Sequence, residues 1–358
     1  MKNNEYNIID DAPRNTHFAA VNSGKGFKSY FFEVFGNERI KKRYIIKGGP
    51  GTGKSSFMRR VAVFAEERGR EVEYFRCSSD PESLDGIIID GSIAVLDGTA
   101  PHVYEPSMVG VTDEIVNLGE FWNTDSLYER YNDISALSAR RSAAYFKVYR
   151  FLSAMSDLNE INDSLAVRAL DREKMRAAVE RILRQVRRGE SFRLEYGLVN
   201  AIGMDGLTHI SSFEKKAKRL YLIYDCYGLG WHFLAQSVDM AMEKRARVQI
   251  SYDPLEPHKP DGVYFPDDGI ALLICDGNGA EGAIRINISR FVIDRAINPV
   301  KAEYRHNRRL RDALLSAAVD ALSEAGEYHF KLEDIYKDSM DFEAESRFVD
   351  EFCERLFK

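Results

Sequence analysis

The sequence predicts an α/β protein built from two copies of one unit, each a three-layer domain with a parallel sheet and a helical appendage. The first observation is a strand, glycine-rich loop and helix pattern at residues 43–65. The second is an internal repeat, because residues 218–277 align with part of the first half. The third is helical periodicity at residues 124–188 and 301–358. A chain of 358 residues is long enough for two domains of ordinary size.

The expected domain boundaries follow this repeat. The first copy is expected at residues 14–123, with a helical segment at 124–188; the second copy, at 193–300, is followed by a C-terminal helical segment at 301–358. Each sheet is thus expected to carry the helical segment that directly follows it in the chain.

The glycine-rich loop, Gly48-Gly-Pro-Gly-Thr-Gly-Lys-Ser55, fits the pattern G-x-x-x-x-G-K-[ST] at every fixed position. An apolar run of strand type precedes it, and a helical stretch follows it. Glycines let the backbone curl so that N–H groups point at phosphate oxygens, and the start of a helix adds a positive dipole end. The pattern therefore predicts a phosphate-binding site made of Gly48, Gly49, Pro50, Gly51, Thr52, Gly53, Lys54, Ser55 and Ser56.

Three residues are expected to serve a nucleoside triphosphate and Mg²⁺ at this loop. Lys54 would reach the β- and γ-phosphates, and the hydroxyl of Ser55 would bind Mg²⁺. Asp97 ends the apolar run Ile93–Asp97, so its carboxylate emerges at the end of a buried strand, where it can hold Mg²⁺ directly or through water. The sequence contains no Asn-Lys-x-Asp motif for guanine, which favours ATP over GTP.

The polar segment Cys77–Gly86 follows a second expected strand and supplies further candidates. Because ligands of open α/β sheets lie beyond the carboxyl ends of strands, Asp80 and Asp85 are candidates for positioning water, metal or substrate in catalysis. Alternatively, both aspartates are turn residues, since Asp80 precedes proline and Asp85 precedes glycine. His102 either contacts the γ-phosphate or substrate, or is structural.

The second copy aligns closely with the first. Lys218–Gly230 lies over Lys41–Gly53, and Ile270–Gly277 matches Ile93–Gly98. Its loop, however, has lost the residues that phosphate needs. Trp231 and His232 stand in place of the lysine and serine, and Asp225 puts a negative charge in place of the first glycine. We expect no ordinary nucleotide binding there. Trp231 either stacks on another ligand or helps to fill the vacated pocket.

Together, the loop and Asp97 resemble the P-loop NTPase superfamily. Over most of the chain, and most densely in residues 14–122, the pattern resembles a group of uncharacterised bacterial ATPase-like proteins with tandem P-loop units. The matching stretches are Lys47–Lys54, Cys77–Asp80, Leu84–Gly86 and Asp97–His102. The resemblance implies binding of ATP and Mg²⁺ by Lys54, Ser55 and Asp97, but it implies no substrate. The second loop departs from it and puts a two-site ATPase in doubt.

Three functions are consistent with these features. The first is a Mg-dependent ATPase with one active site, in which the degenerate copy docks on the intact one as an intramolecular pseudo-dimer with a structural or regulatory role. The second is a small-molecule or nucleotide kinase, with Cys77–Gly86 holding the acceptor. The third is a non-hydrolysing ATP-dependent switch or scaffold, in which binding and not turnover matters. An unknown protein partner could stimulate the first, which is expected to be slow alone.

Composition limits the partners and the compartment. The net charge of −6 gives no general attraction to nucleic acid or to an anionic membrane. The polar N-terminus and the absence of a run of about 18 apolar residues predict a cytoplasmic protein with no membrane association. The four cysteines lack C-x-x-C spacing, which argues against a zinc module and a disulfide framework.

Overall fold

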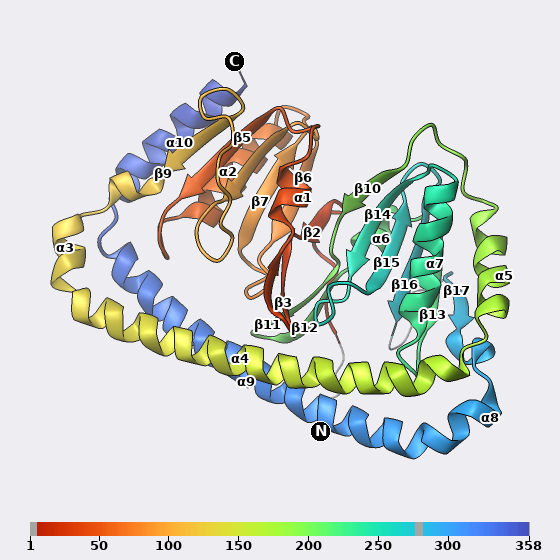
Figure 1. Cartoon of the computed structure of the whole chain (residues 1–358). Helices are drawn as coiled ribbons and strands as arrows, with labels where there is room; N and C mark the ends of the chain where they lie inside the picture. Colours follow the sequence, from red (N-terminus) through yellow and green to blue (C-terminus); the bar gives the residue numbers. More distant parts are fainter. Residues whose placement is uncertain (1–5, 276–281, 358) are drawn as a thin grey trace. The chain divides into compact units, whose positions relative to one another are not determined.

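The structure is a computed structural model that describes residues 6–275 and 282–357. It is a mixed α/β protein whose sheets contain parallel strands (Figure 1). Among the described helices, none is long and apolar enough to cross a membrane. Asp276 and Gly277, which the repeat aligns with Asp97 and Gly98, lie outside the described residues.

The chain divides into two compact units, each of which is described by itself. The Lys54 unit contains Asn15–Ala20, Ser29–Val148 and Asp320–Lys358. The Asp225 unit contains Met1–Arg14, Val21–Lys28 and Tyr149–Val319.

The Lys54 unit contains a six-stranded sheet. In spatial order its strands are β2 (Thr16–Phe18), β6 (Val72–Arg76), β7 (Leu84–Ile89), β8 (Ile93–Asp97), β5 (Lys42–Lys47) and β9 (Asp113–Asn117). β7 runs antiparallel to both neighbours, whereas the β2–β6, β8–β5 and β5–β9 pairs are parallel. The expectation of a wholly parallel sheet is therefore wrong at β7. Residues 77–83 and 90–92 connect it to its neighbours, and a parallel crossover needs roughly a dozen residues or more.

Helices cover both faces of this sheet. α2 (Lys54–Glu66) and α10 (Phe342–Leu356) share one face, where Phe57 and Phe352 belong to the same buried core. α1 (Phe31–Phe35) lies on the other face, and the ring of Phe35 packs edge-on against Phe75 with centroids 5.0 Å apart. Packing of helices on both faces of the sheet fixes the ends of β5 and β8, from which the loop and Asp97 emerge.

The sheet of the Asp225 unit has the same strand order and directions. Its strands are β10 (Arg193–Tyr196), β14 (Arg247–Tyr252), β15 (Pro260–Phe265), β16 (Ile270–Cys275), β13 (Arg219–Tyr224) and β17 (Ile284–Asn287), with β15 antiparallel to its neighbours. α7 (Gly230–Glu243) and α5 (Arg172–Leu183) cover one face through Phe233 and Val179. α6 (Ser212–Lys216) covers the other face through Phe213.

Smaller elements complete the described chain. A three-stranded sheet contains β1 (Asn7–Ile9), β12 (Gly206–Ile210) and β11 (Asn200–Gly203), and a pair is formed by β3 (Ala20–Ser23) and β4 (Gly26–Ser29). Short 3₁₀ helices are η1 (Leu118–Phe121), η2 (Val167–Ala169), η3 (Ile288–Phe291) and η4 (Asn298–Val300).

The two predicted helical segments are helical, but neither belongs only to the unit of the sheet that precedes it. The first forms α3 (Thr124–Glu129), α4 (Tyr131–Ala166) and α5; the second contains α9 (Lys301–Lys337) and α10, after α8 (Asp294–Ile297). α4 and α9 each contribute residues to both units. α5 packs against α7 in the Asp225 unit, and α10 packs against α2 in the Lys54 unit. The terminal helix of each segment thus packs in the unit whose sheet does not directly precede that segment in the chain.

Candidate functional site

The glycine-rich loop connects β5 to α2, and its backbone is tightly curled. Gly51 and Gly53 have φ angles of +68° and +78°, a left-handed conformation that glycine adopts without a side-chain clash. A Cβ on Gly48 would lie 2.6 Å from Oγ1 of Thr52. The Thr52 hydroxyl in turn donates a hydrogen bond to the carbonyl of Gly49 at 3.0 Å. The curl of the loop therefore requires glycine at these positions.

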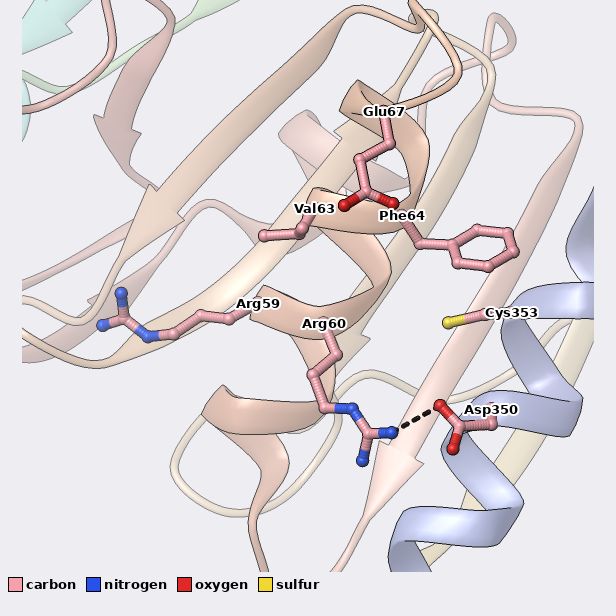
Figure 2. Close-up of a pocket in the computed structure, with 7 residues that line it drawn as sticks. All are labelled: Arg59, Arg60, Val63, Phe64, Glu67, Asp350 and Cys353. Atoms are coloured by element: carbon pink, nitrogen blue, oxygen red, sulfur yellow. Dashed lines mark hydrogen bonds and ion pairs between the residues drawn. The ribbon is translucent and has the colours of Figure 1, made fainter.

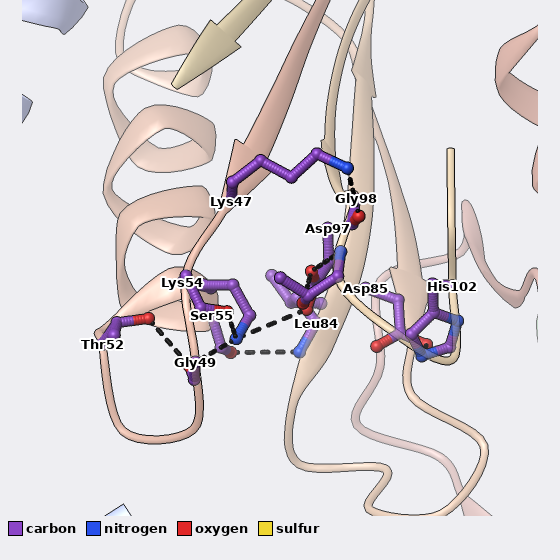
Figure 3. Close-up of polar contacts among 12 residues, drawn as sticks. Lys47, Gly49, Thr52, Lys54, Ser55, Leu84, Asp85, Asp97, Gly98 and His102 are labelled. Atoms are coloured by element: carbon purple, nitrogen blue, oxygen red, sulfur yellow. Dashed lines mark hydrogen bonds and ion pairs between the residues drawn. The ribbon is translucent and has the colours of Figure 1, made fainter. Parts of the chain in front are cut away.

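Lys54 lies across this loop at the start of α2 (Figure 3). Its Nζ donates hydrogen bonds to the carbonyls of Gly48 and Gly49, at 3.1 and 2.8 Å, and lies 3.7 Å from Oδ2 of Asp97. Asp97 ends β8, the parallel neighbour of β5, and is in register with Ile46. The two side chains are only 16% and 12% exposed, so solvent screens their attraction weakly. The fold thus brings together the lysine and the acid that were expected to act together.

Ser55 and Asp97 supply further oxygen atoms to the polar cluster of Lys54, Asp97 and the glycine-rich loop. Oγ of Ser55 accepts a hydrogen bond from the amide of Leu84 at 3.0 Å, which ties the first turn of α2 to the start of β7. Oδ1 of Asp97 accepts hydrogen bonds from the Thr99 amide, at 2.8 Å, and from the Thr99 hydroxyl. A hydroxyl and a carboxylate beside a curled loop are the oxygen donors that Mg²⁺ takes alongside phosphate. The residues therefore fit the metal and the ligand class that the motif implies.

Pro50, Ser56 and Asp80 are three further predicted residues. Pro50 is partly buried within the loop, and Ser56 is exposed on the first turn of α2. Asp80 lies in the turn between β6 and β7, where its carboxylate accepts hydrogen bonds from the Ser83 hydroxyl at 2.7 Å and the Glu82 amide at 3.2 Å. These contacts favour the turn interpretation of Asp80 over a catalytic one.

Asp85 is buried, and it pairs with His102 (Figure 3). Its Oδ2 lies 3.4 Å from Nε2 of His102, whose ring stacks on Phe31 with centroids 4.7 Å apart. Burial raises the pKa of Asp85 to about 6, and the charge of His102 opposes this rise. The interpretation of Asp85 and Gly86 as turn residues is wrong, because both belong to β7.

Helices from the C-terminal part of the chain lie against the loop, a feature that no motif indicated. A Cβ on Gly51 would lie 2.5 Å from the carbonyl oxygen of Glu333 in α9. One on Gly53 would lie 3.4 Å from Oε1 of Glu345 in α10. A hydrogen bond from His329 lowers the pKa of Glu333 to about 2, so this side chain is held as an anion. A ligand at the loop would therefore adjoin both helices.

A shallow pocket of about 300 Å³ lies between α2 and α10 (Figure 2). It is lined by Arg59, Arg60, Val63, Phe64, Glu67, Asp350 and Cys353. An ion pair of 2.6 Å between Arg60 and Asp350 spans it. It contains none of the predicted site residues, so it lends no support to nucleotide binding.

In the Asp225 unit, the side chain of Asp225 closes the loop that follows β13. The carboxylate of Asp225 accepts hydrogen bonds from the amides of Tyr227 and Gly230, at 3.0 and 2.5 Å, and also from those of Gly228 and Leu229. Burial raises the pKa of Asp225, and these hydrogen bonds oppose the rise. Backbone amides that would meet phosphate in an intact loop thus surround an internal carboxylate.

Trp231 and His232 both lie close to Asp163, a residue of the same unit. Nε1 of Trp231 donates a hydrogen bond to Oδ1 of Asp163 in α4 at 3.1 Å, and Nε2 of His232 lies 3.7 Å from the same oxygen. Nζ of Lys259 lies 5.3 Å from the ring centroid of Trp231. Of the two interpretations of Trp231, these contacts favour the one in which it fills the vacated position.

Asp261, which the repeat aligns with Asp85, makes the stability of the Asp225 unit depend on pH. It is buried, and its Oδ2 accepts a hydrogen bond from Nδ2 of Asn200 at 2.6 Å. Burial raises its pKa from 3.8 to about 6, so the folded state binds the proton more tightly than the unfolded chain does. The stabilisation from this proton is therefore fully present below about pH 4 and is lost as the pH rises through about 6.

We expect Asp261→Asn to stabilise the Asp225 unit at pH 8 by up to about 3 kcal/mol, because a shift of about two pK units is worth that much. Little stabilisation is expected at pH 4. The amide keeps an oxygen for Asn200. Urea unfolding can be followed by Trp231 fluorescence in a Trp122→Phe background, since these are the only two tryptophans and each unit holds one. Exposed Asp239→Asn is the control. An equal effect of Asp261→Asn at both pH values would contradict this explanation.

Comparisons of the chain with models of protein families, with curated proteins and with solved structures found no match.

Proposed function

We propose that this chain binds Mg-ATP at the loop Gly48–Ser55 and hydrolyses it, with one active site in the Lys54 unit. The observation that carries the proposal is the position of Nζ of Lys54, between the loop carbonyls and Oδ2 of Asp97, at the ends of two neighbouring parallel strands. Loop, lysine and acid are the parts by which P-loop proteins hold Mg-nucleotides. The fold that we propose is accordingly of the P-loop NTPase type.

The proposal includes an internal duplication. It is supported by the common strand order and directions of the two sheets, including the antiparallel strand at the same place in each. In the second copy, the carboxylate of Asp225 takes the amides that phosphate would need. We therefore assign the second copy a structural or regulatory role and no ATP site.

Each residue has a separate part in the proposed reaction. The loop amides bind phosphate oxygens, and Lys54 exchanges its hydrogen bonds to Gly48 and Gly49 for hydrogen bonds to the phosphates. Ser55 and Asp97 hold Mg²⁺, which neutralises phosphate charge when it is bound. Positioning and charge stabilisation account for most of the catalysis of phosphoryl transfer, so this set covers the principal requirement.

A second candidate function, an ATP-dependent switch or scaffold for a protein partner, is favoured by the helices against the loop. Glu345 of α10 lies close to Gly53, and burial raises the pKa of its carboxyl group. A phosphate bound at the loop would repel the Glu345 carboxylate, and this repulsion is strong where solvent is partly excluded. Nucleotide binding would then move α10 relative to α2.

Phosphate release by wild type, Asp97→Asn and Asp80→Asn tests the proposal. We expect wild type to release phosphate from Mg-ATP without an added acceptor. Asp97→Asn should lower kcat roughly 100-fold, because it removes a charge that holds the metal while retaining an oxygen for Thr99. Asp80→Asn should stay within about twofold of wild type, since Asp80 holds only the β6–β7 turn.

Each other outcome has a distinct meaning. Formation of ADP and a phosphorylated product only when an alcohol or nucleotide acceptor is added, without release of free phosphate, would replace hydrolysis by a kinase activity. Tight binding with negligible release, together with a change in the protection of α10 amides from hydrogen exchange, would favour the switch. An equal loss of activity in Asp80→Asn and Asp97→Asn would contradict the assignment of the metal-binding acid.

A further inference from the structure

Three donor side chains of different chemistry meet beside the loop in the Lys54 unit. Cys77 directly follows β6, Asp85 belongs to β7, and His102 lies in the chain that follows β8. One donor atom from each side chain lies within 4.8 Å of the other two. β7 pairs with both β6 and β8, so the sheet itself brings these three positions together.

Backbone hydrogen bonds hold Cys77 and His102 in place. The amide of Cys77 donates a hydrogen bond to the Ser83 carbonyl at 3.0 Å, which closes the turn between β6 and β7. The amide of His102 donates to the Thr99 carbonyl at 2.8 Å, and Phe31 stacks on the imidazole with an interplanar angle of 17°. These contacts fix the backbone at Cys77 and the plane of the His102 ring before any ligand arrives.

The carboxylate of Asp85 supplies a second observation that points to a ligand. Its side chain is only 6% exposed, and Oδ2 takes no hydrogen bond from the residues that the structure describes. The thiol of Cys77 hydrogen-bonds this carboxyl group. Burying a carboxylate whose oxygen lacks a hydrogen-bond donor is costly, and a bound cation would offset that cost.

We propose that Cys77, Asp85 and His102 bind one Zn²⁺ ion through Sγ, a carboxylate oxygen and an imidazole nitrogen. Tetrahedral zinc with bonds of about 2.0–2.3 Å places its donor atoms roughly 3.3–3.6 Å apart, and the Asp85 Oδ2 to His102 Nε2 separation is 3.4 Å. Cys77 binds as the thiolate, and its proton passes to solvent. The thiolate and imidazole select zinc over Mg²⁺, which prefers oxygen ligands.

Three protein ligands leave a fourth position for water, the arrangement found in catalytic rather than structural zinc sites. The site adjoins the phosphate-binding residues, because the charges of Lys54 and Asp97 both act on Asp85. Tyr145 of α4, which hydrogen-bonds Ser79, is also within electrostatic reach of Cys77 and Asp85. This zinc site is separate from the Mg²⁺ site at Ser55 and Asp97, and it does not rest on ATP binding.

Reconstitution with zinc tests the proposal. The full chain is freed of metal by a chelator, loaded with Zn²⁺, desalted and measured by plasma mass spectrometry. We expect about one zinc per chain in wild type, and a loss of at least tenfold in occupancy in Cys77→Ala and in His102→Ala. Cys353→Ala, which removes the other cysteine of the same unit, should bind zinc as wild type does. Loading with Co²⁺ should give a thiolate-to-cobalt absorption band that Cys77→Ala abolishes.

Circular dichroism of each metal-free variant shows whether it is folded, and Cys77→Ser replaces Cys77→Ala if the latter is not. Lys54→Ala should retain full zinc binding, so failure of ATP binding and failure of zinc binding are distinguishable. The proposal is overturned if folded wild type keeps less than about 0.1 zinc per chain after loading. Occupancy in folded Cys77→Ala or Cys77→Ser equal to that of wild type would overturn it as well.

Discussion

Replacing Lys54 by alanine is expected to weaken Mg-ATP binding about 100-fold. A hydrogen bond to a charged group is worth about 1.5–3 kcal/mol, and Lys54 is positioned to make two, so a loss of about 3 kcal/mol is a conservative expectation. In the free protein the lysine bonds to the carbonyls of Gly48 and Gly49. These bonds must be exchanged on binding, which keeps the net effect below the sum of two full hydrogen bonds.

Calorimetric titration with Mg-ATP measures this effect, and Lys41→Ala is the matched control. Lys41 is an exposed lysine of the same unit whose Nζ donates only to the Glu38 carbonyl among the described contacts, at 3.1 Å. Its loss changes the net charge equally but should alter the affinity less than twofold. Trp122 packs against Gly49, so its fluorescence reports whether the loop remains folded in Lys54→Ala. Equal affinities of Lys54→Ala and wild type would refute the proposed site.

Replacing Asp225 by alanine is expected to destabilise the Asp225 unit by about 3 kcal/mol. The substitution leaves the amides of Tyr227 and Gly230, and those between them, without their buried acceptor. Each unsatisfied buried donor costs about 1–3 kcal/mol, and entry of water reduces the total. Inorganic phosphate or sulfate should restore part of the lost stability, because the freed amides then form an anion-binding loop.

Urea unfolding of the Trp122→Phe background, followed through Trp231, measures this change. Asp225→Asn is the matched variant, since it keeps one acceptor oxygen, removes the charge and replaces the second acceptor oxygen by an NH2 group. We expect it to lie between wild type and Asp225→Ala and to gain less from phosphate. If Asp225→Ala is as stable as its parent, or if phosphate stabilises both equally, the carboxylate does not act as the internal anion of this loop.

The residues of the loop were predictable because their constraints are local. A curled loop between a strand and a helix needs glycines within a few positions, and Lys54 and Ser55 follow directly in the chain. The partner Asp97 was predictable because an apolar strand ending in an acid follows at a suitable distance. By contrast, Glu333 and Glu345 reach the loop through the packing of α9 and α10, and a helical stripe does not specify the surface that it covers.

The direction of β7 could have been predicted from the length of its connections. Only residues 90–92 connect β7 to β8, and so short a connection permits only an antiparallel pair, although a parallel sheet was expected. The grouping of Cys77, Asp85 and His102 had no sequence signal, because their spacing matches no metal motif. It arises from the pairing of β7 with both neighbours, which only the fold reveals.

The central claim, one intact site and one degenerate copy, is tested most directly by the stoichiometry of Mg-ATP binding to the full chain. We predict one nucleotide per chain in wild type, one in Trp231→Ala, and none detectable at the same concentrations in Lys54→Ala. Two nucleotides per chain, or one that Trp231→Ala removes and Lys54→Ala retains, would contradict the claim.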